Sequence, residues 1–157
     1  MMKNRLPTPT DRDTAEYFQL ALRCGIASTR DVERWGHHRL ANGGWAAALT
    51  HCGDDLSRVL TRLDDVVGSP TGRLSGQMLL ARAHQCWKRG EVDGEALARS
   101  LYELWPEEVF PEDVQQEVVS VDDDYDLVDE GKRQAPRADS RLGAFLERFE
   151  PFELLLP

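Results

Sequence analysis

The sequence predicts an all-α fold, a compact and irregular domain of about seven helices. Leu, Val, Phe and Trp recur at helical spacing along much of the chain. Asp, Ser or Thr stands before several of these segments, where a helix N-cap is needed, and a glycine follows them, where a left-handed residue ends a helix. The glycines concerned are Gly25, Gly43, Gly53, Gly68 and Gly90.

The first helix is expected from about Asp13 to Cys24, with Thr10 or Asp11 near its N-cap. The second helix starts at Ser28, and Asp31 takes the place of the usual glutamate in a capping box. These two segments predict a helix pair at the beginning of the chain.

Gly36 interrupts the second helix and weakens it by about 1 kcal/mol relative to alanine, so we expect it at a close helix crossing. A short, Ala-rich third helix covers 45–52. The fourth begins after Asp54 or Asp55 and carries an apolar stripe that continues to Val67. The members of that stripe are Leu56, Val59, Leu60, Leu63, Val66 and Val67.

The fifth helix is expected over 74–89, and the sixth runs from near Asp93 until Pro106 stops it, with Trp105 on its inward side. Residues 109–121 are compatible with a small β element, although Pro111 followed by two acids favours a further helix.

The composition of 131–138 predicts an exposed connection, after which Asp139 or Ser140 caps a last helix. We expect one helical domain over 1–157, with residues 1–10 flexible. Because two Cys-Gly pairs are each followed by a capped amphipathic segment, a short αα-hairpin repeat remains an alternative to an irregular domain.

The charge is unevenly distributed along the chain. Between Ser100 and Gly131 there are twelve carboxylates and no Lys, Arg or His, whereas the other residues carry nineteen Lys and Arg against sixteen carboxylates. A concentrated field of one sign raises the association rate of an oppositely charged partner by roughly 10–1000-fold. The acidic segment therefore favours a basic partner.

Several functional classes lack their usual motifs. No phosphate-binding glycine loop, H-E-x-x-H helix, G-x-S-x-G elbow or C-x-x-C pair occurs, and the three cysteines fit reduced, packed thiols. Basic residues alternate with acids, which disfavours nucleic-acid binding, and no apolar run is long enough to span a membrane. We therefore expect a cytoplasmic protein that is not an enzyme and needs no cofactor.

A metal-dependent hydrolase is the alternative, using the Asp122–Asp126 cluster. Asp122, Asp124 and Asp126 follow the D-x-D-x-D spacing of the first ligands of a calcium loop. The match ends there, because Leu127 stands where the loop needs glycine and Arg133 where it needs a bidentate glutamate. A helical adaptor or regulatory binding protein is a third possibility.

Three strings together resemble a known class of proteins: 16–18 leading to 24–26, then 31–35, and the acidic string 123–127. The pattern is similar to small acidic helical immunity proteins of bacterial polymorphic-toxin systems. The resemblance implies a cytoplasmic antidote that binds one cognate toxin and blocks its active site or substrate surface without a cofactor.

The sequence thus predicts an immunity-type antitoxin that neutralises a basic toxin domain, such as a nuclease, through an acidic surface. Tyr125 is expected to be the aromatic anchor of that surface, since tyrosine is enriched at interface hot spots. The partner-binding residues expected are Glu107, Glu108, Glu112, Asp113, Asp122, Asp123, Asp124, Tyr125, Asp126, Asp129 and Glu130.

Overall fold

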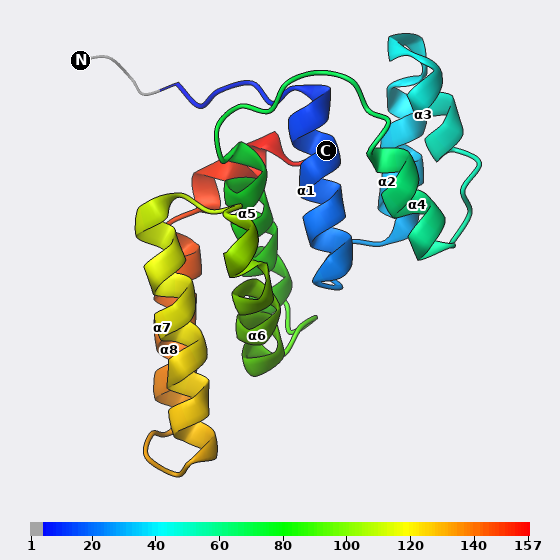
Figure 1. Ribbon diagram of the computed structural model, residues 1–157. Helices are drawn as coiled ribbons and strands as arrows, with labels where there is room; N and C mark the ends of the chain where they lie inside the picture. The colour runs from blue at the N-terminus through cyan, green and yellow to red at the C-terminus, as the bar shows by residue number, and fades with distance from the viewer. Residues whose placement is uncertain (1–4) are drawn as a thin grey trace. The chain divides into compact units, whose positions relative to one another are not determined.

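The computed structural model describes residues 5–157, and within that range every regular element is a helix, which confirms the all-α prediction (Figure 1). No strand forms at 109–121, because α7 begins at Glu112 and runs through that segment. The elements are α1 Asp11–Arg23, α2 Thr29–His38, η1 Leu40–Asn42, α3 Gly44–Leu49, α4 Leu56–Leu63, α5 Leu74–Lys88, α6 Gly94–Leu104, η2 Trp105–Glu107, α7 Glu112–Asp129, α8 Ala135–Glu147 and η3 Glu150–Leu155.

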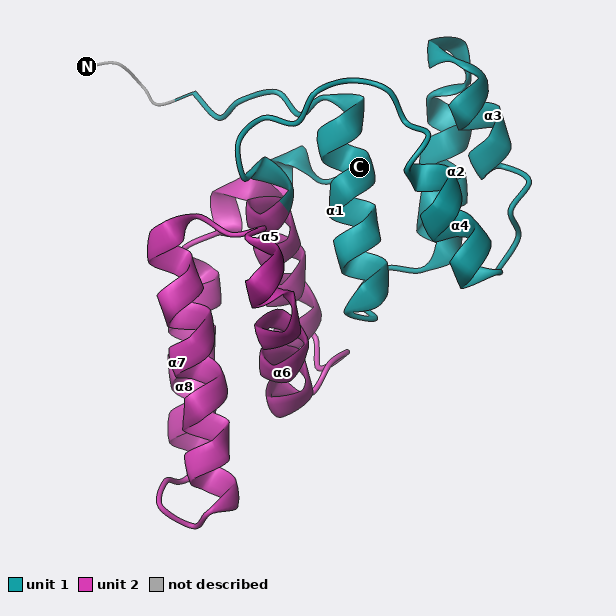
Figure 2. Ribbon diagram, viewed as in Figure 1, with its two compact units in different colours: residues 1–75, 154–157 teal, residues 76–153 magenta. Residues whose placement is uncertain are grey.

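The chain forms two compact units where the sequence indicated one domain (Figure 2). Unit 1 comprises Met1–Ser75 and Leu154–Pro157, and unit 2 comprises Gly76–Glu153. Helices α1 to α4 lie in unit 1, whereas α6, α7 and α8 lie in unit 2. The whole acidic segment therefore belongs to unit 2.

Local capping chemistry sets the beginnings of four helices, α1, α2, α4 and α6, as predicted. Thr10 caps α1, and Ser28 and Asp31 form the expected capping box of α2. Asp55 caps α4 and Asp93 caps α6, each through a side-chain oxygen that accepts a backbone N–H bond. Each such cap satisfies a helix N–H group that has no intrahelical partner.

The core of unit 1 is built around aromatic side chains. The ring of Trp35 lies 5.5 Å from that of Phe18 and 5.2 Å from that of Trp45, measured between centroids. Gly36 allows α2 and α3 to approach closely, because a Cβ there would lie 3.0 Å from the carbonyl oxygen of Ala46. The close crossing predicted from this glycine is confirmed.

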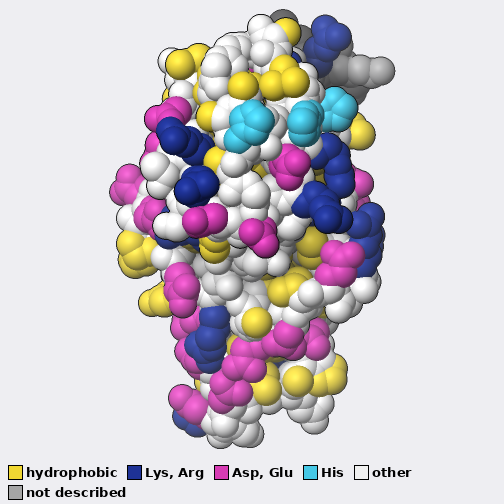
Figure 3. Space-filling view, turned by 90° about the vertical axis from the view of Figure 1, so that its right-hand side faces the viewer, with side chains coloured by type: hydrophobic (Ala, Val, Ile, Leu, Met, Phe, Trp, Pro, Cys, Tyr) yellow, Lys and Arg dark blue, Asp and Glu magenta, His cyan; other side chains and the backbone are white. Residues whose placement is uncertain are grey.

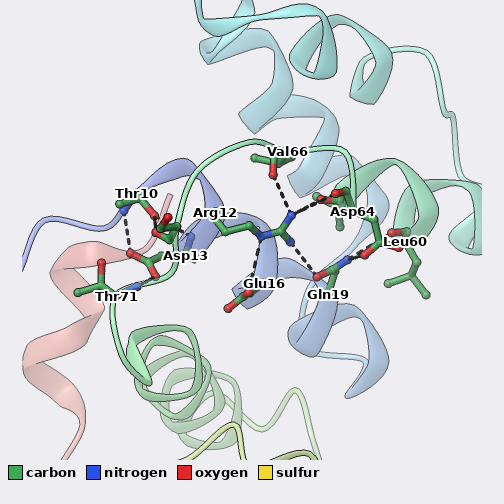
Figure 4. Close-up of polar contacts among 11 residues, drawn as sticks. Thr10, Arg12, Asp13, Glu16, Gln19, Leu60, Asp64, Val66 and Thr71 are labelled. Atoms are coloured by element: carbon green, nitrogen blue, oxygen red, sulfur yellow. Dashed lines mark hydrogen bonds and ion pairs between the residues drawn. The ribbon is translucent and has the colours of Figure 1, made fainter.

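Arg12 ties the segment after α4 to α1 (Figure 4). Its Nη1 donates to the carbonyl oxygens of Leu63 and Val66, both at 3.0 Å, while its Nη2 donates to Gln19 at 3.1 Å. Gln19 in turn donates to the Asp64 carboxylate at 2.6 Å. A cation at the carboxyl end of α4 stabilises the carbonyls left unpaired there.

Asp13 fixes the other end of the same connection (Figure 4). Its carboxylate accepts the N–H of Thr71 at 2.6 Å and that of Thr10 at 2.9 Å, and the residue is fully buried. Burial alone would raise the pKa of Asp13, but these hydrogen bonds outweigh burial and lower it.

Helices α6, α7 and α8 pack against one another in unit 2 (Figure 1). The buried stripe of α7 is formed by Val114, Val118, Val121 and Tyr125, at helical spacing. From α8, Leu142, Phe145 and Leu146 are buried as well. The residues of α7 that remain outward carry most of its carboxylates.

Helices α4 and α8 each differ from the prediction at one end. Helix α4 ends at Leu63, so Val67 is 66% exposed instead of continuing the apolar stripe. Helix α8 begins at Ala135, inside the segment 131–138 that composition marked as a connection, and no side chain caps it. The reason is Pro136, which is well suited to the first turn of a helix because its missing N–H would be unpaired there.

The expected flexible segment 1–10 lies partly outside the described residues, which begin at Arg5, and Thr10 at its end is held by the cap of α1. Of the helices in the described part of the chain, none has the length and apolar character that crossing a membrane requires.

Candidate protein-binding surface

The expected partner-binding residues separate into two groups in the structure. Those from Asp122 to Glu130 are mostly buried or paired with basic side chains of unit 2, whereas those between Glu107 and Glu112 are exposed. The difference decides which of them can meet a partner.

Asp124 lies inside unit 2. Its side chain is 3% exposed and forms ion pairs with Arg133 and with Arg141, whose Nη1 is 3.1 Å from Oδ1. Both arginines lie C-terminal to the acidic segment, in the α7–α8 connection and in α8. The carboxylate therefore joins α7 to these elements and is not available to a partner.

Arg99 of α6 neutralises a second set of carboxylates. Its Nη2 is 2.7 Å from Asp126 and 3.3 Å from both Asp129 and Glu95, and its Nη1 is 3.6 Å from Asp122. Asp122 is 4% exposed. One guanidinium on α6 thus holds three carboxylates of α7.

Burial raises the pKa of Asp122. Arg99 opposes this effect, while the neighbouring charges of Asp126 and Asp123 reinforce it. The single arginine therefore does not offset the combined effect of burial and the two neighbouring carboxylates on this pKa.

Tyr125 does not lie on the surface, contrary to the expectation that it anchors an interface. It is 3% exposed, and its hydroxyl donates to Oδ1 of Asp139 at 2.6 Å. Burial and this carboxylate raise its pKa. Asp139, expected as a helix cap, instead lies within α8 and accepts this hydrogen bond.

Exposed ion pairs occupy two other parts of the acidic segment. Arg148 of α8 pairs with Glu117 and, at 3.8 Å, with Asp113. Lys132 pairs with Glu130 at 2.9 Å. Such solvent-exposed pairs are worth about 0–1 kcal/mol each, so a charged partner could exchange them at little cost.

A further group of exposed residues forms what we call the 102–112 surface. It comprises Tyr102, Glu103, Trp105, Glu107, Glu108 and Glu112, all of which are exposed. They stand on the end of α6, on η2 and on the start of α7, and η2 contacts α7. This part of unit 2 combines carboxylates with large aromatic side chains.

The local backbone explains why these residues point outward. Leu101 and Leu104 take the buried positions of α6, and Pro106 lies in the tight turn η2. Glu108 follows in a left-handed conformation with φ of 54°, and its N–H donates to the carbonyl of Trp105. The turn leaves Tyr102 41% exposed and Trp105 42% exposed.

Sequence reasoning missed three of these residues. Tyr102 was not expected at a surface, Glu103 was counted in the acidic segment but not among the partner-binding residues, and Trp105 was expected inward with Leu101 and Leu104. The proline directly after Trp105 was the available signal, because a residue at the very end of a helix need not follow its apolar stripe.

The metal ligands expected for a hydrolase are not brought together as a set. Asp122, Asp123 and Asp126 approach one another, with one oxygen from each within 4.8 Å of the others. Asp124 belongs instead to the arginine pairs described above, and Arg99 already contacts Asp122 and Asp126. Any cation at this cluster would share two ligands with a guanidinium.

On the face drawn in Figure 3, several Lys and Arg side chains adjoin one another, and Asp and Glu side chains lie beside them. A nucleic-acid surface needs clustered cations to hold phosphates, and carboxylates beside the cations weaken that attraction.

Comparison of the chain with protein-family models, with curated proteins and with solved structures found no match. Function is therefore inferred from the chemistry of the 102–112 surface.

Proposed function

We propose that the chain acts by binding a basic protein surface, and that in the cell it is an immunity-type antidote to a toxin domain. The observation that carries this proposal is the 102–112 surface. Among the residues that the structure describes, no Lys or Arg forms an ion pair with Glu103, Glu108 or Glu112.

The composition of this surface suits protein recognition. Exposed carboxylates attract a cationic surface over distances of about 10 Å at moderate salt, and thereby raise the association rate. Exposed tyrosine and tryptophan provide the apolar area that interfaces bury at their centres. Tyr102 and Trp105 supply both residue types within one helical turn.

A nuclease is the class of toxin that this surface fits best. Nucleases bind phosphates through a groove rich in Lys and Arg. An acidic protein seated on such a groove excludes the substrate directly and needs no chemistry of its own. The proposed partner is therefore a basic toxin domain in the same cytoplasm.

The first test is the identification of a partner. The tagged chain is expressed in its native host, and co-purified proteins are identified by mass spectrometry. We expect a basic protein encoded beside this chain, and its toxicity should be suppressed when the two are produced together.

The second test measures association with the purified partner. In stopped-flow experiments, Glu103→Gln combined with Glu108→Gln should slow association about tenfold at low salt, and the difference should shrink as salt screens the charges. The matched control is Glu91→Gln combined with Glu130→Gln, which removes the same charge from the opposite ends of α6 and α7. We expect the control to change the rate less than about twofold.

Equal rates for the two double variants would contradict the assignment of binding to this surface. A partner that binds with no salt dependence would contradict the electrostatic basis of the proposal altogether.

A further inference from the structure

Tyr102 and Trp105 form an aromatic pair whose rings are open to solvent. The ring planes are nearly parallel, 7° apart, with centroids separated by 6.4 Å. Each residue is about two fifths exposed, and Trp105 is the most exposed tryptophan of the chain. In a folded unit that buries most of its large side chains, such a pair marks an interaction site.

Carboxylates lie between and after the two aromatic residues in the sequence. Glu103 lies between the two aromatic residues, and Glu108 follows in the same turn, both exposed. A group bound against the rings would therefore lie within a field of negative charge. Charge complementarity selects a cation over a neutral apolar group.

We propose that the aromatic pair and its flanking glutamates form a subsite for an arginine side chain of the partner. The inference rests on the proposed function, which it extends from a basic surface to a particular residue. The guanidinium stacks on the exposed aromatic rings while its N–H groups pair with carboxylates of the same turn.

Arginine fits this subsite better than lysine does. Its guanidinium is planar and weakly hydrated, stacks on aromatic faces and donates two parallel hydrogen bonds to a carboxylate. A lysine ammonium is a compact and strongly hydrated charge that can use the glutamates but gains less from the rings.

The subsite is held in place by the backbone before any partner arrives. Pro106 fixes one φ angle of η2, and the N–H of Glu108 closes the turn onto the carbonyl of Trp105. Leu101 and Leu104, 1% and 2% exposed, anchor the same helical turn in the core. Binding therefore orders few additional groups, which favours affinity.

The test compares two acetylated hexapeptides of equal charge, hexa-arginine and hexa-lysine, by isothermal titration calorimetry with the full chain at low salt. We expect the arginine peptide to bind about threefold to tenfold more tightly, since the stacking contribution is absent for lysine. Fluorescence of the exposed Trp105 should change with hexa-arginine in parallel.

Two variants separate stacking from charge. Tyr102→Ala combined with Trp105→Ala should abolish the preference for arginine while leaving weak, salt-dependent binding of both peptides. Glu103→Gln combined with Glu108→Gln should weaken the binding of both peptides and keep the preference for arginine over lysine. Because all four side chains are exposed, far-ultraviolet circular dichroism should confirm that both variants remain folded.

Equal affinities for the two peptides, or a preference that survives the double alanine variant, would overturn the arginine subsite. Either result would leave the proposed function standing if the purified partner still associates more slowly with the glutamine variant. Loss of that rate effect would reject the proposed function instead.

Discussion

Replacing Gly94 by alanine tests whether Tyr125 is a structural residue of unit 2. Gly94 is the first residue of α6 and is buried. A Cβ at this position would lie 2.5 Å from the Tyr125 hydroxyl and 3.0 Å from Oδ1 of Asp139. Since real Cβ atoms do not approach heavy atoms to 2.5 Å, the tyrosine must move and its hydrogen bond to Asp139 must weaken.

Three contributions set the size of the effect. Overpacking of a core costs about 1–3 kcal/mol, and a weakened hydrogen bond to a charged group costs about 1.5–3 kcal/mol. Alanine recovers up to about 1 kcal/mol of helix propensity. We therefore expect Gly94→Ala to lower the free energy of unfolding by about 1.5–6 kcal/mol.

The assay is a double-mutant cycle with Tyr125→Phe, measured by urea denaturation. Phenylalanine lacks the hydroxyl that a new Cβ would strike, so the alanine should cost about 1–2 kcal/mol less in that background. Ala96→Gly, at an exposed position of the same helix, is the control and should cost about 1 kcal/mol in both backgrounds.

Additive effects of Gly94→Ala and Tyr125→Phe, within about 0.5 kcal/mol, would refute the proposed contact. Tyr125→Phe should also leave the association rate with a partner unchanged, because the residue is buried. A large loss of affinity without loss of stability would restore Tyr125 as an interface residue.

Three further variants probe the buried polar groups and one close approach. Hydrogen bonds lower the folded pKa of Asp13, so the stability that its carboxylate contributes is complete above the unfolded value near 3.8 and is lost as the pH falls through the folded pKa. In urea titrations, Asp13→Asn should therefore lower the free energy of unfolding at pH 6 and lower it less at pH 3. Burial raises the pKa of Asp122, so ionisation of this carboxyl group destabilises the fold above its folded pKa. The Asp122→Asn variant should therefore be at least as stable as the native chain at pH 7, and this gain in stability should disappear at pH 3. A Cβ at Gly76 would lie 2.0 Å from the carbonyl oxygen of Val109, so Gly76→Ala should lower the thermal midpoint by several degrees, as calorimetry can measure.

The helix beginnings could be predicted because capping is local chemistry. Thr10, Ser28, Asp55 and Asp93 each act within three residues of their own position, so the sequence contains the whole interaction. The close helix crossing at Gly36 could also be predicted, because a glycine inside a helix has few explanations other than the close approach of another helix.

The ends of the helices and the fate of Tyr125 could not be predicted in the same way. The stripe of α4 continues to Val67 in the sequence, but the helix stops at Leu63, where Arg12 of another helix binds the final carbonyls. Tyr125 resembled an interface residue because its neighbours are charged. Only the folded structure shows that the Tyr125 hydroxyl donates a hydrogen bond to Asp139 and lies close to Gly94.

The acidic residues are segregated in the sequence, but folding places basic residues beside many of them. The arginines that neutralise the second half of α7 come from outside the acidic segment, at positions 99, 133 and 141, and reach it only after the helices have packed. Within the described residues, Glu103, Glu108 and Glu112 form no ion pair with Lys or Arg, although the sequence alone ranks them no higher than the D-D-D-Y-D string. A buried carboxylate that loses its arginine threatens the fold, whereas an exposed one that loses its charge changes only the field that a partner meets. Measurements of stability and of association rate therefore show whether each carboxylate has a structural or a binding role. The number of acidic residues in a stretch of sequence does not distinguish the two roles.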